Sequence, residues 1–222
     1  SVGLMGSFLK LEESLLNFVL TGAITSGVLQ ITQLDVAYAF LYDVWSKSIK
    51  HTFLAPISEF HFIIGSWIIG IIRGILVGLM MAGFSYYAFD FSLPPFGISV
   101  IFLFGVFLTA LIIGMFVCLL IILFGQRVEV TAWSLVMLIM LICGIYYPVS
   151  YLPKIIIYLS ELIPLTYFLE YFRMGYGFKP VFSHLLLKGF GLSFFYIIFL
   201  FYLLNLAWKR ARKTGIILRL SE

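Results

Sequence analysis

The chain has 222 residues, of which 63% are apolar and only 11% are charged, and its formal net charge is +4. A soluble domain carries about 25% charged residues, so this composition excludes an ordinary soluble protein and predicts one that is embedded in a bilayer. The pI near 9.0 reflects a basic C-terminal segment that suits a membrane surface. No basic stripe with interleaved aromatic residues indicates nucleic-acid binding, so nucleic acid is not an expected partner.

Apolar stretches of about 20 residues or more follow one another along the chain, and each is long enough for a helix to cross about 30 Å of hydrocarbon. We therefore predict an all-α polytopic membrane protein, with residues 1–222 forming a single transmembrane domain. The five expected spans are Leu15–Tyr42, Phe62–Phe89, Ile98–Phe124, Val130–Tyr147 and Leu185–Trp208.

Basic residues are distributed unevenly between the loops. The segment after the last span, the 43–61 loop and the 125–129 turn carry most of them, whereas the loop Phe89–Gly97 has none. The positive-inside rule then places the C-terminus in the cytoplasm and residue 1 outside, in a multi-pass protein of the cell (cytoplasmic) membrane. Because no targeting segment precedes this outer N-terminus, we expect the sequence to be a fragment that lacks an earlier span.

The first expected span is the least apolar, and its polar residues include Gln33 and Asp35. Polar side chains within a membrane helix face protein or a water-filled cavity, because lipid cannot satisfy them. Two readings stay open: ordinary helix packing, and a helix that lines a translocation path. Two tyrosines at the end of the fourth span, Tyr146 and Tyr147, are further path candidates.

The segment from Asp43 to Ala55 has the pattern of a short amphipathic helix at the cytoplasmic surface, ended by a proline. It is either an interfacial anchor or a docking element for a cytoplasmic partner. The candidate docking residues are Asp43, Trp45, Lys47, Ile49, Lys50, Phe53 and Pro56.

The second span is expected to begin with Ser58 as its N-cap, followed by Glu59 near the positive end of the helix. Arg73 then lies near mid-membrane, where an arginine costs at least about 2.5–3.5 kcal/mol and is paired or hydrated. Asp35 on the first span is a candidate partner. Glycines at a spacing of four residues predict a close helix crossing, and these are Gly70, Gly74 and Gly78.

The region from Gly144 to Gly177 is interrupted by prolines. Ser150 is expected to cap a short helix that reaches about Leu162, and Pro164 to begin another that ends near Gly175 or Gly177. We predict a pair of short outer helices, either re-entrant helices that form a hairpin in the outer leaflet or an interfacial pair. Their tyrosines are read either as an aromatic belt at the interface or as stacking platforms for a sugar or amphipathic cargo. The residues assigned to this motif are Pro148, Pro153, Pro164, Tyr167 and Arg173.

Motifs of catalysis and nucleotide binding are missing from the sequence. There is no P-loop, no Gly-x-Ser-x-Gly elbow and no His-Glu-x-x-His. Cys118 and Cys143 lie within apolar runs and the histidines are scattered, so we expect no metal site, cofactor or catalytic residue. If transport uses energy, a partner must supply it.

The order of these motifs resembles the membrane permease subunit of type-2 ABC exporters, the ABC-2 type transporters. The resemblance covers nearly the whole chain, although that family usually has Glu or Arg with a Gly early in the cytoplasmic helix, where this chain has Asp43, Lys47 and Ser48. It rests on Leu54-Ala55-Pro56, Gly65, Gly144–Pro153 with Pro148 and Leu152-Pro153, Pro164-Leu165-Thr166-Tyr167 and Arg173.

The resemblance implies a homodimer of permeases that works with two P-loop ATPase subunits, with Asp43–Ala55 as the coupling helix. It also implies six spans in the full chain, so that an N-terminal amphipathic helix and a first span are missing here. The expected function is outward transport of an amphipathic cargo, such as a lipid-linked glycan, a polysaccharide or a drug. The alternatives are a polytopic membrane enzyme acting on lipid-linked substrates, and a structural or assembly protein without cargo.

Overall fold

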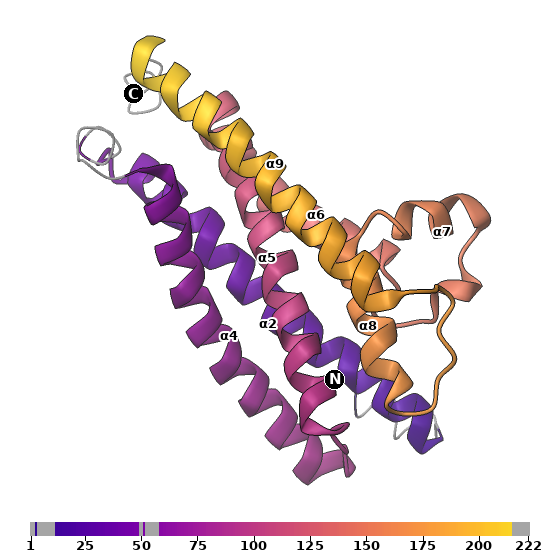
Figure 1. Cartoon of the computed structure of the whole chain (residues 1–222). Coiled ribbons are helices and arrows are strands. Elements are labelled where there is room, and N and C mark those ends of the chain that lie inside the picture. The colour runs from indigo at the N-terminus through magenta and orange to yellow at the C-terminus, as the bar shows by residue number, and fades with distance from the viewer. Residues whose placement is uncertain (1–2, 4–11, 49–50, 52–57, 215–222) are drawn as a thin grey trace.

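A computed structural model describes residues 3, 12–48, 51 and 58–214, and in this part of the chain the ordered elements are helices. The long helices lie side by side and are inclined in the same sense (Figure 1). The elements are α2 (Glu13–Trp45), α4 (Glu59–Phe89), α5 (Phe96–Phe124), η1 (Gly125–Val128), α6 (Glu129–Ile142), η2 (Val149–Tyr151), α7 (Lys154–Ser160), α8 (Pro164–Met174) and α9 (Leu185–Thr214).

Four of these helices, α2, α4, α5 and α9, are long and apolar enough to cross a membrane, and the bent pair of α7 and α8 would count as a fifth span if it is taken as one. The all-α polytopic fold predicted from the sequence is therefore confirmed. The fourth expected span, Val130–Tyr147, differs: α6 ends at Ile142 after 14 residues. At 1.5 Å per residue it is about 21 Å long, which is shorter than the hydrocarbon core.

The early end of α6 has a backbone cause. Gly144 has a φ of +73°, a conformation that suits glycine and that a helix cannot continue through. Four residues later Pro148 holds an extended conformation before the short turn η2. The chain thus leaves the helix before it reaches the two tyrosines that the sequence analysis had placed at the end of the span.

α5 occupies the centre of the helix assembly and contacts α2, α8 and α9. Its middle is buried almost without interruption from Gly105 to Met115. By contrast α4 packs mainly against α2 and leaves a broad apolar surface exposed, including Ile72, Leu79 and Met80. Such a surface suits a helix whose outer side meets lipid or another protein chain.

The α2–α4 contact depends on the predicted glycine face. A Cβ on Gly74 would lie 2.5 Å from Thr32 Oγ1, and one on Gly70 would lie 2.9 Å from the Thr32 carbonyl oxygen. Gly78 faces Val28 in the same way. The close helix crossing expected from the spacing of four is present, because the absence of a side chain at these positions lets α2 pack directly against the α4 backbone.

The outer region forms two short helices at a break. Pro164 begins α8 as expected, and Gly175 follows its last residue. Ser150, however, does not cap the first of the two short helices, α7. It lies in η2, and Pro153 takes the N-cap position of α7. The axes of α7 and α8 meet at nearly a right angle, with a bend of 93°, and α8 packs against α5 and α9.

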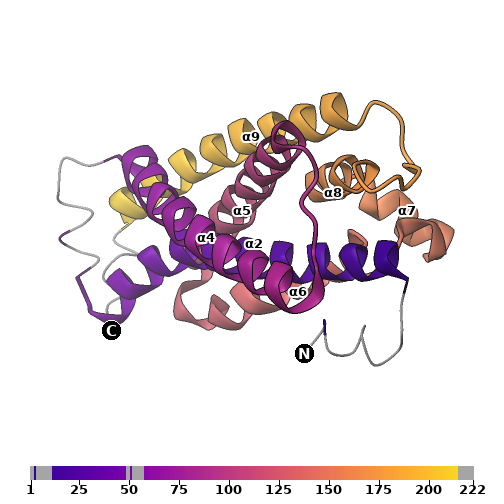
Figure 2. The ribbon, with the colours of Figure 1, turned by 90° about the horizontal axis from the view of Figure 1, so that it is seen from below.

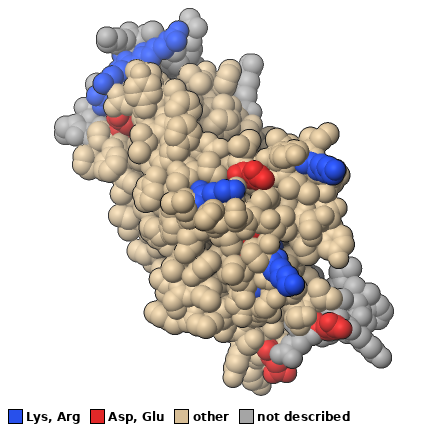
Figure 3. Space-filling model, turned by 45° about the vertical axis from the view of Figure 1, so that its right-hand side comes forward, with Lys and Arg blue, Asp and Glu red and all other residues tan. Residues whose placement is uncertain are grey.

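Charged side chains are sparse over the face of the molecule in Figure 3, and basic residues gather at the end where α9 finishes. Lys209, Arg210 and Arg212 are exposed there. The start of α4 is at the same end in Figure 1. Ser58 caps it as predicted, with its hydroxyl oxygen accepting a hydrogen bond from the His61 amide at 3.4 Å.

Candidate functional site

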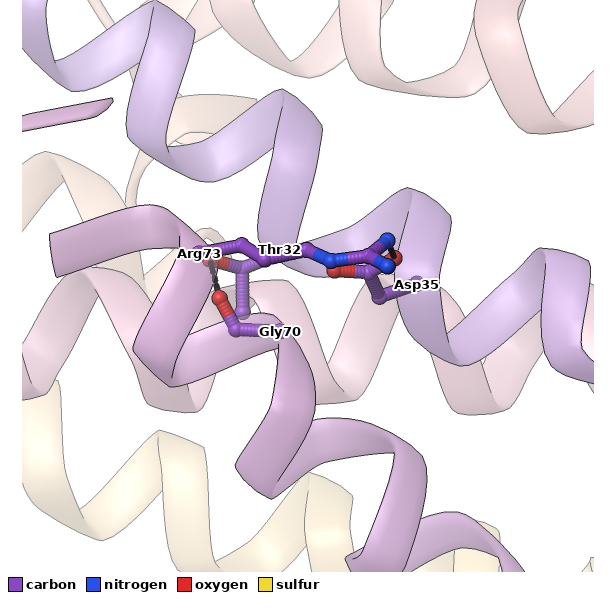
Figure 4. A network of polar contacts seen from close by, with 4 residues as sticks. All are labelled: Thr32, Asp35, Gly70 and Arg73. Atoms are coloured by element: carbon purple, nitrogen blue, oxygen red, sulfur yellow. Dashed lines mark hydrogen bonds and ion pairs between the residues drawn. The ribbon is translucent and has the colours of Figure 1, made fainter. Parts of the chain in front are cut away.

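Asp35 and Arg73 form an ion pair between α2 and α4, with 2.6 Å between the Asp35 Oδ1 and an Arg73 guanidinium nitrogen (Figure 4). The Arg73 side chain is 62% exposed and that of Asp35 is 17% exposed. The second carboxylate oxygen, Asp35 Oδ2, is buried and has no hydrogen-bond partner among the residues that the structure describes. The ion pair that the sequence analysis named as a candidate is therefore formed, and its arginine side chain is largely exposed.

Local packing brings the two charges together. The Thr32 hydroxyl donates a hydrogen bond of 3.1 Å to the carbonyl oxygen of Gly70, which fixes one helix against the other. The two helices run in opposite directions, so Asp35 and Arg73 lie about one turn to either side of this contact, and the long Arg73 side chain extends across to Asp35 (Figure 4). The glycine-lined crossing and the threonine bond bring the two helices close enough for the arginine to reach the carboxylate.

A second polar contact on α2 joins it to α6. Trp133 Nε1 donates a hydrogen bond of 2.5 Å to the Tyr38 hydroxyl. Tyr38 also makes edge-to-face ring contacts with Tyr42 and Trp45 further along α2. Tyr42 and Trp133 are well exposed, so these rings present an aromatic surface with hydrogen-bonding groups.

A third contact lies toward the other end of α2. The Tyr146 hydroxyl donates to Ser26 Oγ at 3.1 Å. Both residues border a cavity of about 410 Å³ between α2 and α4, with Met80, Met81 and Ser85 on the α4 side. By contrast, the Tyr147 hydroxyl donates a hydrogen bond to the carbonyl oxygen of Leu141 in α6, the helix just before it in the chain.

Asp35 and Tyr38 lie about one turn apart on α2, whereas Ser26 lies about 180° around the helix from Asp35. From Ser26 to Tyr38 the helix rises about 18 Å, more than half of the hydrocarbon thickness. We call this set the polar track; it consists of Ser26, Asp35, Tyr38, Arg73, Trp133 and Tyr146.

Gln33, which the sequence analysis grouped with Asp35, lies elsewhere. Its side chain is fully buried, and its amide nitrogen donates a long hydrogen bond of 3.5 Å to the Ala132 carbonyl oxygen of α6. Two residues on an α-helix are separated by about 200°, so Gln33 and Asp35 face different neighbours. Gln33 is a packing contact between α2 and α6 and does not belong to the polar track.

The residues of the outer motif converge on Arg173 of α8. Its guanidinium donates to the carbonyl oxygens of Gly144 and Ile145, at 2.7 and 2.5 Å. Its central carbon also lies 3.5 Å from the ring centre of Phe18 on α2. One buried arginine thus satisfies the carbonyl groups left free where the chain departs from α6, and it joins α8 to the start of α2.

Neighbouring residues support the same arrangement. Glu170 Oε2 accepts hydrogen bonds from the amides of Val181 and Phe182, at 3.1 and 3.2 Å. The Tyr167 hydroxyl donates to the Glu161 carbonyl oxygen at 2.9 Å. Arg173 and Tyr167 of the outer motif, together with Glu170, therefore hold the two short helices and the segment before α9 in place.

The predicted cytoplasmic helix is described only in part. Asp43 and Trp45 lie in the last turn of α2, and Lys47 has a φ of +58°, so the helix ends there and does not run on from Asp43 as expected. Ser48 Oγ donates to Asp43 Oδ1 at 3.0 Å across this turn. The other candidate docking residues, Ile49, Lys50, Phe53 and Pro56, lie outside the described residues.

The same end of the molecule holds one contact that the sequence analysis missed. The Asn205 amide of α9 donates a hydrogen bond to the Glu59 carboxylate in the first turn of α4. A polar residue within an apolar span is the signal that could have found it. Among the described residues, no group of three or more His, Cys, Asp and Glu side chains could hold a metal ion.

The family model of the ABC-2 type transporter matches residues 4–177, which is most of the chain. This chain belongs to the ABC-2 type transporter family, and it is a multi-pass membrane protein, the transmembrane subunit of an ABC transporter. The family association implies an ABC ATPase subunit as partner. A search of curated proteins gave no match.

Proposed function

We propose that this chain is the permease of an ATP-driven exporter that moves an amphipathic cargo outward across the cytoplasmic membrane. The observation that carries the proposal is the polar track, which gathers charged and aromatic hydrogen-bonding side chains along one membrane helix in a chain of this family. ATP is hydrolysed by a separate subunit, and the permease itself carries out no chemical reaction.

The composition of the polar track suits an amphipathic cargo. Tyr38 and Trp133 offer aromatic faces with a hydroxyl and an indole N–H, and the Asp35–Arg73 pair offers a charged acceptor and donor group. An exposed arginine near mid-membrane is tolerated where water or protein surrounds it.

A second copy of the permease would complete this interior. The Asp35–Arg73 pair is exposed in the single chain, and a homodimer that encloses the polar track between its copies would shield the pair from lipid. We therefore place the cargo path between two copies, with α2 of each facing it.

The orientation follows from charge. The basic end of α9 and the turn at Lys47 belong to the cytoplasmic side. The Glu59–Asn205 hydrogen bond joins α4 and α9 at that end. Movement of an ATPase against residues 43–55 would pass directly into α2 and α4, which flank this segment and which carry the ion pair.

The competing function as a membrane enzyme needs an outer carboxylate that is free to act as an acid or base. Glu170 is committed to two backbone amides, which supports a structural role for it.

Cross-linking between copies tests the proposed path. Cysteine at Tyr38 or Asp35, in the permease purified with its ATPase, is expected to cross-link to the same position in a second copy and to lose that cross-link when ATP is added. Cysteine at Phe195, an exposed position on α9, is the control and should give neither result. Labelling of positions 35 and 38 by lipid-dissolved probes alone, without any protein cross-link, would contradict the proposal.

A further inference from the structure

The last helix, α9, has one buried side and one exposed side. It runs along an edge of the helix assembly and packs against α5 and α8 (Figure 2). The side chains that face the protein are buried, and they are Leu200, Leu204, Ala207 and Ala211. The opposite side is exposed and carries apolar and aromatic side chains. We call these the outer stripe, which consists of Ile198, Tyr202 and Leu206.

Three basic residues follow the outer stripe at the end of α9, namely Lys209, Arg210 and Arg212, and all three are exposed. Lys209 follows Ile198 by three turns and about 20°, since each residue of a helix turns it by about 100°. Lys209 therefore continues the outer stripe, and Arg210 and Arg212 lie on either side of it. The basic side chains belong to the side of α9 that faces away from the protein.

The depth of these basic residues matches the headgroup layer of a bilayer. With 30 residues, α9 is about 45 Å long, close to the thickness of a bilayer with its headgroups, about 40–45 Å. Lys209 lies about 15 Å from the middle of the helix near Phe199, and Arg212 about 20 Å from it. The hydrocarbon ends about 15 Å from the bilayer centre. The outer stripe thus adjoins the acyl chains of one leaflet, and the basic residues adjoin its headgroups.

The protein does not neutralise these positive charges. Neither Lys209 nor Arg212 forms an ion pair with a carboxylate in the part of the chain that the structure describes. The Arg212 guanidinium carbon lies 5.8 Å from the centre of the Trp208 ring. Glu59, at the same end of the molecule, accepts a hydrogen bond from the Asn205 amide. Exposed cations at a membrane surface attract anions, and lipid phosphates are the anions present in a headgroup layer.

We propose that the end of α9 binds an anionic phospholipid, with an acyl chain along the outer stripe and the headgroup phosphate at Lys209 and Arg212. An acidic surface of a soluble protein would meet the basic residues but would leave the outer stripe unused. A phospholipid matches both, because its apolar and charged parts follow one another in the same order. A zwitterionic headgroup would bind less well, since its own cation opposes the two basic side chains. This site is separate from the polar track.

Fluorescence quenching tests this site. The permease with its ATPase would be reconstituted in nanodiscs of phosphatidylcholine with a minor share of phosphatidylglycerol, and Leu206→Cys would carry a fluorescent label. Per molecule, brominated phosphatidylglycerol should quench this label roughly tenfold more than brominated phosphatidylcholine, because each cation near the surface contributes about fivefold to binding. The preference should fall as the salt concentration rises.

Two controls accompany this measurement. A label on Tyr87→Cys is the matched probe, because Tyr87 is exposed in the last turn of α4, which holds no basic residue. It should show no preference between the two lipids. In the charge variants, Lys209→Gln/Arg212→Gln should lose the preference at position 206. Lys209→Arg/Arg212→Lys keeps both charges and should retain it.

Three results would overturn the proposal. One is equal quenching by the two lipids at position 206 with Lys209 and Arg212 intact. Another is a label at position 206 that neither lipid reaches, since protein would then cover the outer stripe. The third is loss of the ATPase from Lys209→Gln/Arg212→Gln with an unchanged lipid preference, which would assign the basic residues to a protein contact. The first two measurements need only Leu206→Cys, so they decide the matter even if the charge variant fails to fold.

Discussion

The Arg73 guanidinium and the Asp35 carboxylate meet at 2.6 Å across the α2–α4 contact, while 62% of the Arg73 side chain remains exposed. The ion pair therefore belongs both to the packing of two membrane helices and to an open surface. Its two roles can be separated by experiment.

We expect Asp35→Asn alone to destabilise the permease by about 2.5–3.5 kcal/mol, because it leaves an unpaired arginine in the membrane. The double variant Asp35→Asn/Arg73→Gln removes both charges and should recover most of the stability. Export by the double variant should stay low, since the polar track has lost its charged groups. Unfolding in detergent and a transport assay measure the two effects.

Lys179→Gln, which removes an exposed charge in the outer loop, is the control for loss of charge and should change neither measurement. Normal export by the folded double variant would mean that the pair is structural only.

The glycine face of α4 gives a second prediction. Gly74→Ala would place a Cβ 2.5 Å from Thr32 Oγ1 and 2.9 Å from Phe107. Overpacking of this kind costs about 1–3 kcal/mol, so the melting temperature should fall. Gly65→Ala is the matched control on the same helix, because no atom lies within 4 Å of its Cβ position. Equal melting temperatures for the two variants would contradict the close crossing.

Arg173 is expected to be essential for the outer region. Arg173→Met removes two charge-assisted hydrogen bonds and leaves two carbonyl groups unsatisfied, which should cost at least about 3 kcal/mol. Hydrogen exchange should become faster in residues 144–153 and in α8, while α4 stays protected. Arg173→Lys should recover only part of the protection, because an ammonium group lacks the fork that reaches both oxygens.

Lys154→Met, at an exposed position in α7, is the matched control and should leave the exchange of both segments unchanged. Unchanged exchange in Arg173→Met would show that Arg173 is dispensable.

The long helices were predictable because length and apolar character alone determine them, and α2, α4, α5 and α9 were all expected. The end of α6 was harder to predict, since it depends on the backbone conformation of Gly144 within an otherwise apolar run. The resemblance in motif order was confirmed by the family match.

The candidate site was predicted in part. Asp35 and Arg73 were found because charges in a membrane span are costly and few partners exist. Trp133 and Tyr38 were missed, because aromatic residues in apolar runs give no signal until two helices are brought together. Gln33 was named as a path candidate with Asp35, and its buried side chain contacts the α6 backbone, a contact that the sequence of α2 alone does not indicate.

Topology can be tested with an impermeant thiol reagent on intact cells. Cysteine at Ser92 or Ser183, both exposed positions between helices at the proposed outer side, should be labelled. Cysteine at Ser48 should be labelled only after the membrane is opened. The native Cys118 and Cys143 are buried and should give no background. Labelling of position 48 in intact cells would invert the proposed orientation.

The most direct test of ATP-driven export is ATP hydrolysis by the purified complex of permease and ATPase. Ile49→Asp or Phe53→Asp places a charge on the apolar stripe of the predicted coupling segment and should abolish transport-coupled hydrolysis while the permease still inserts and folds. His51→Asp, which adds the same charge at an exposed position, should retain it. Normal coupled turnover in both Ile49→Asp and Phe53→Asp would contradict the coupling role and, with it, the proposed mechanism of energy transfer.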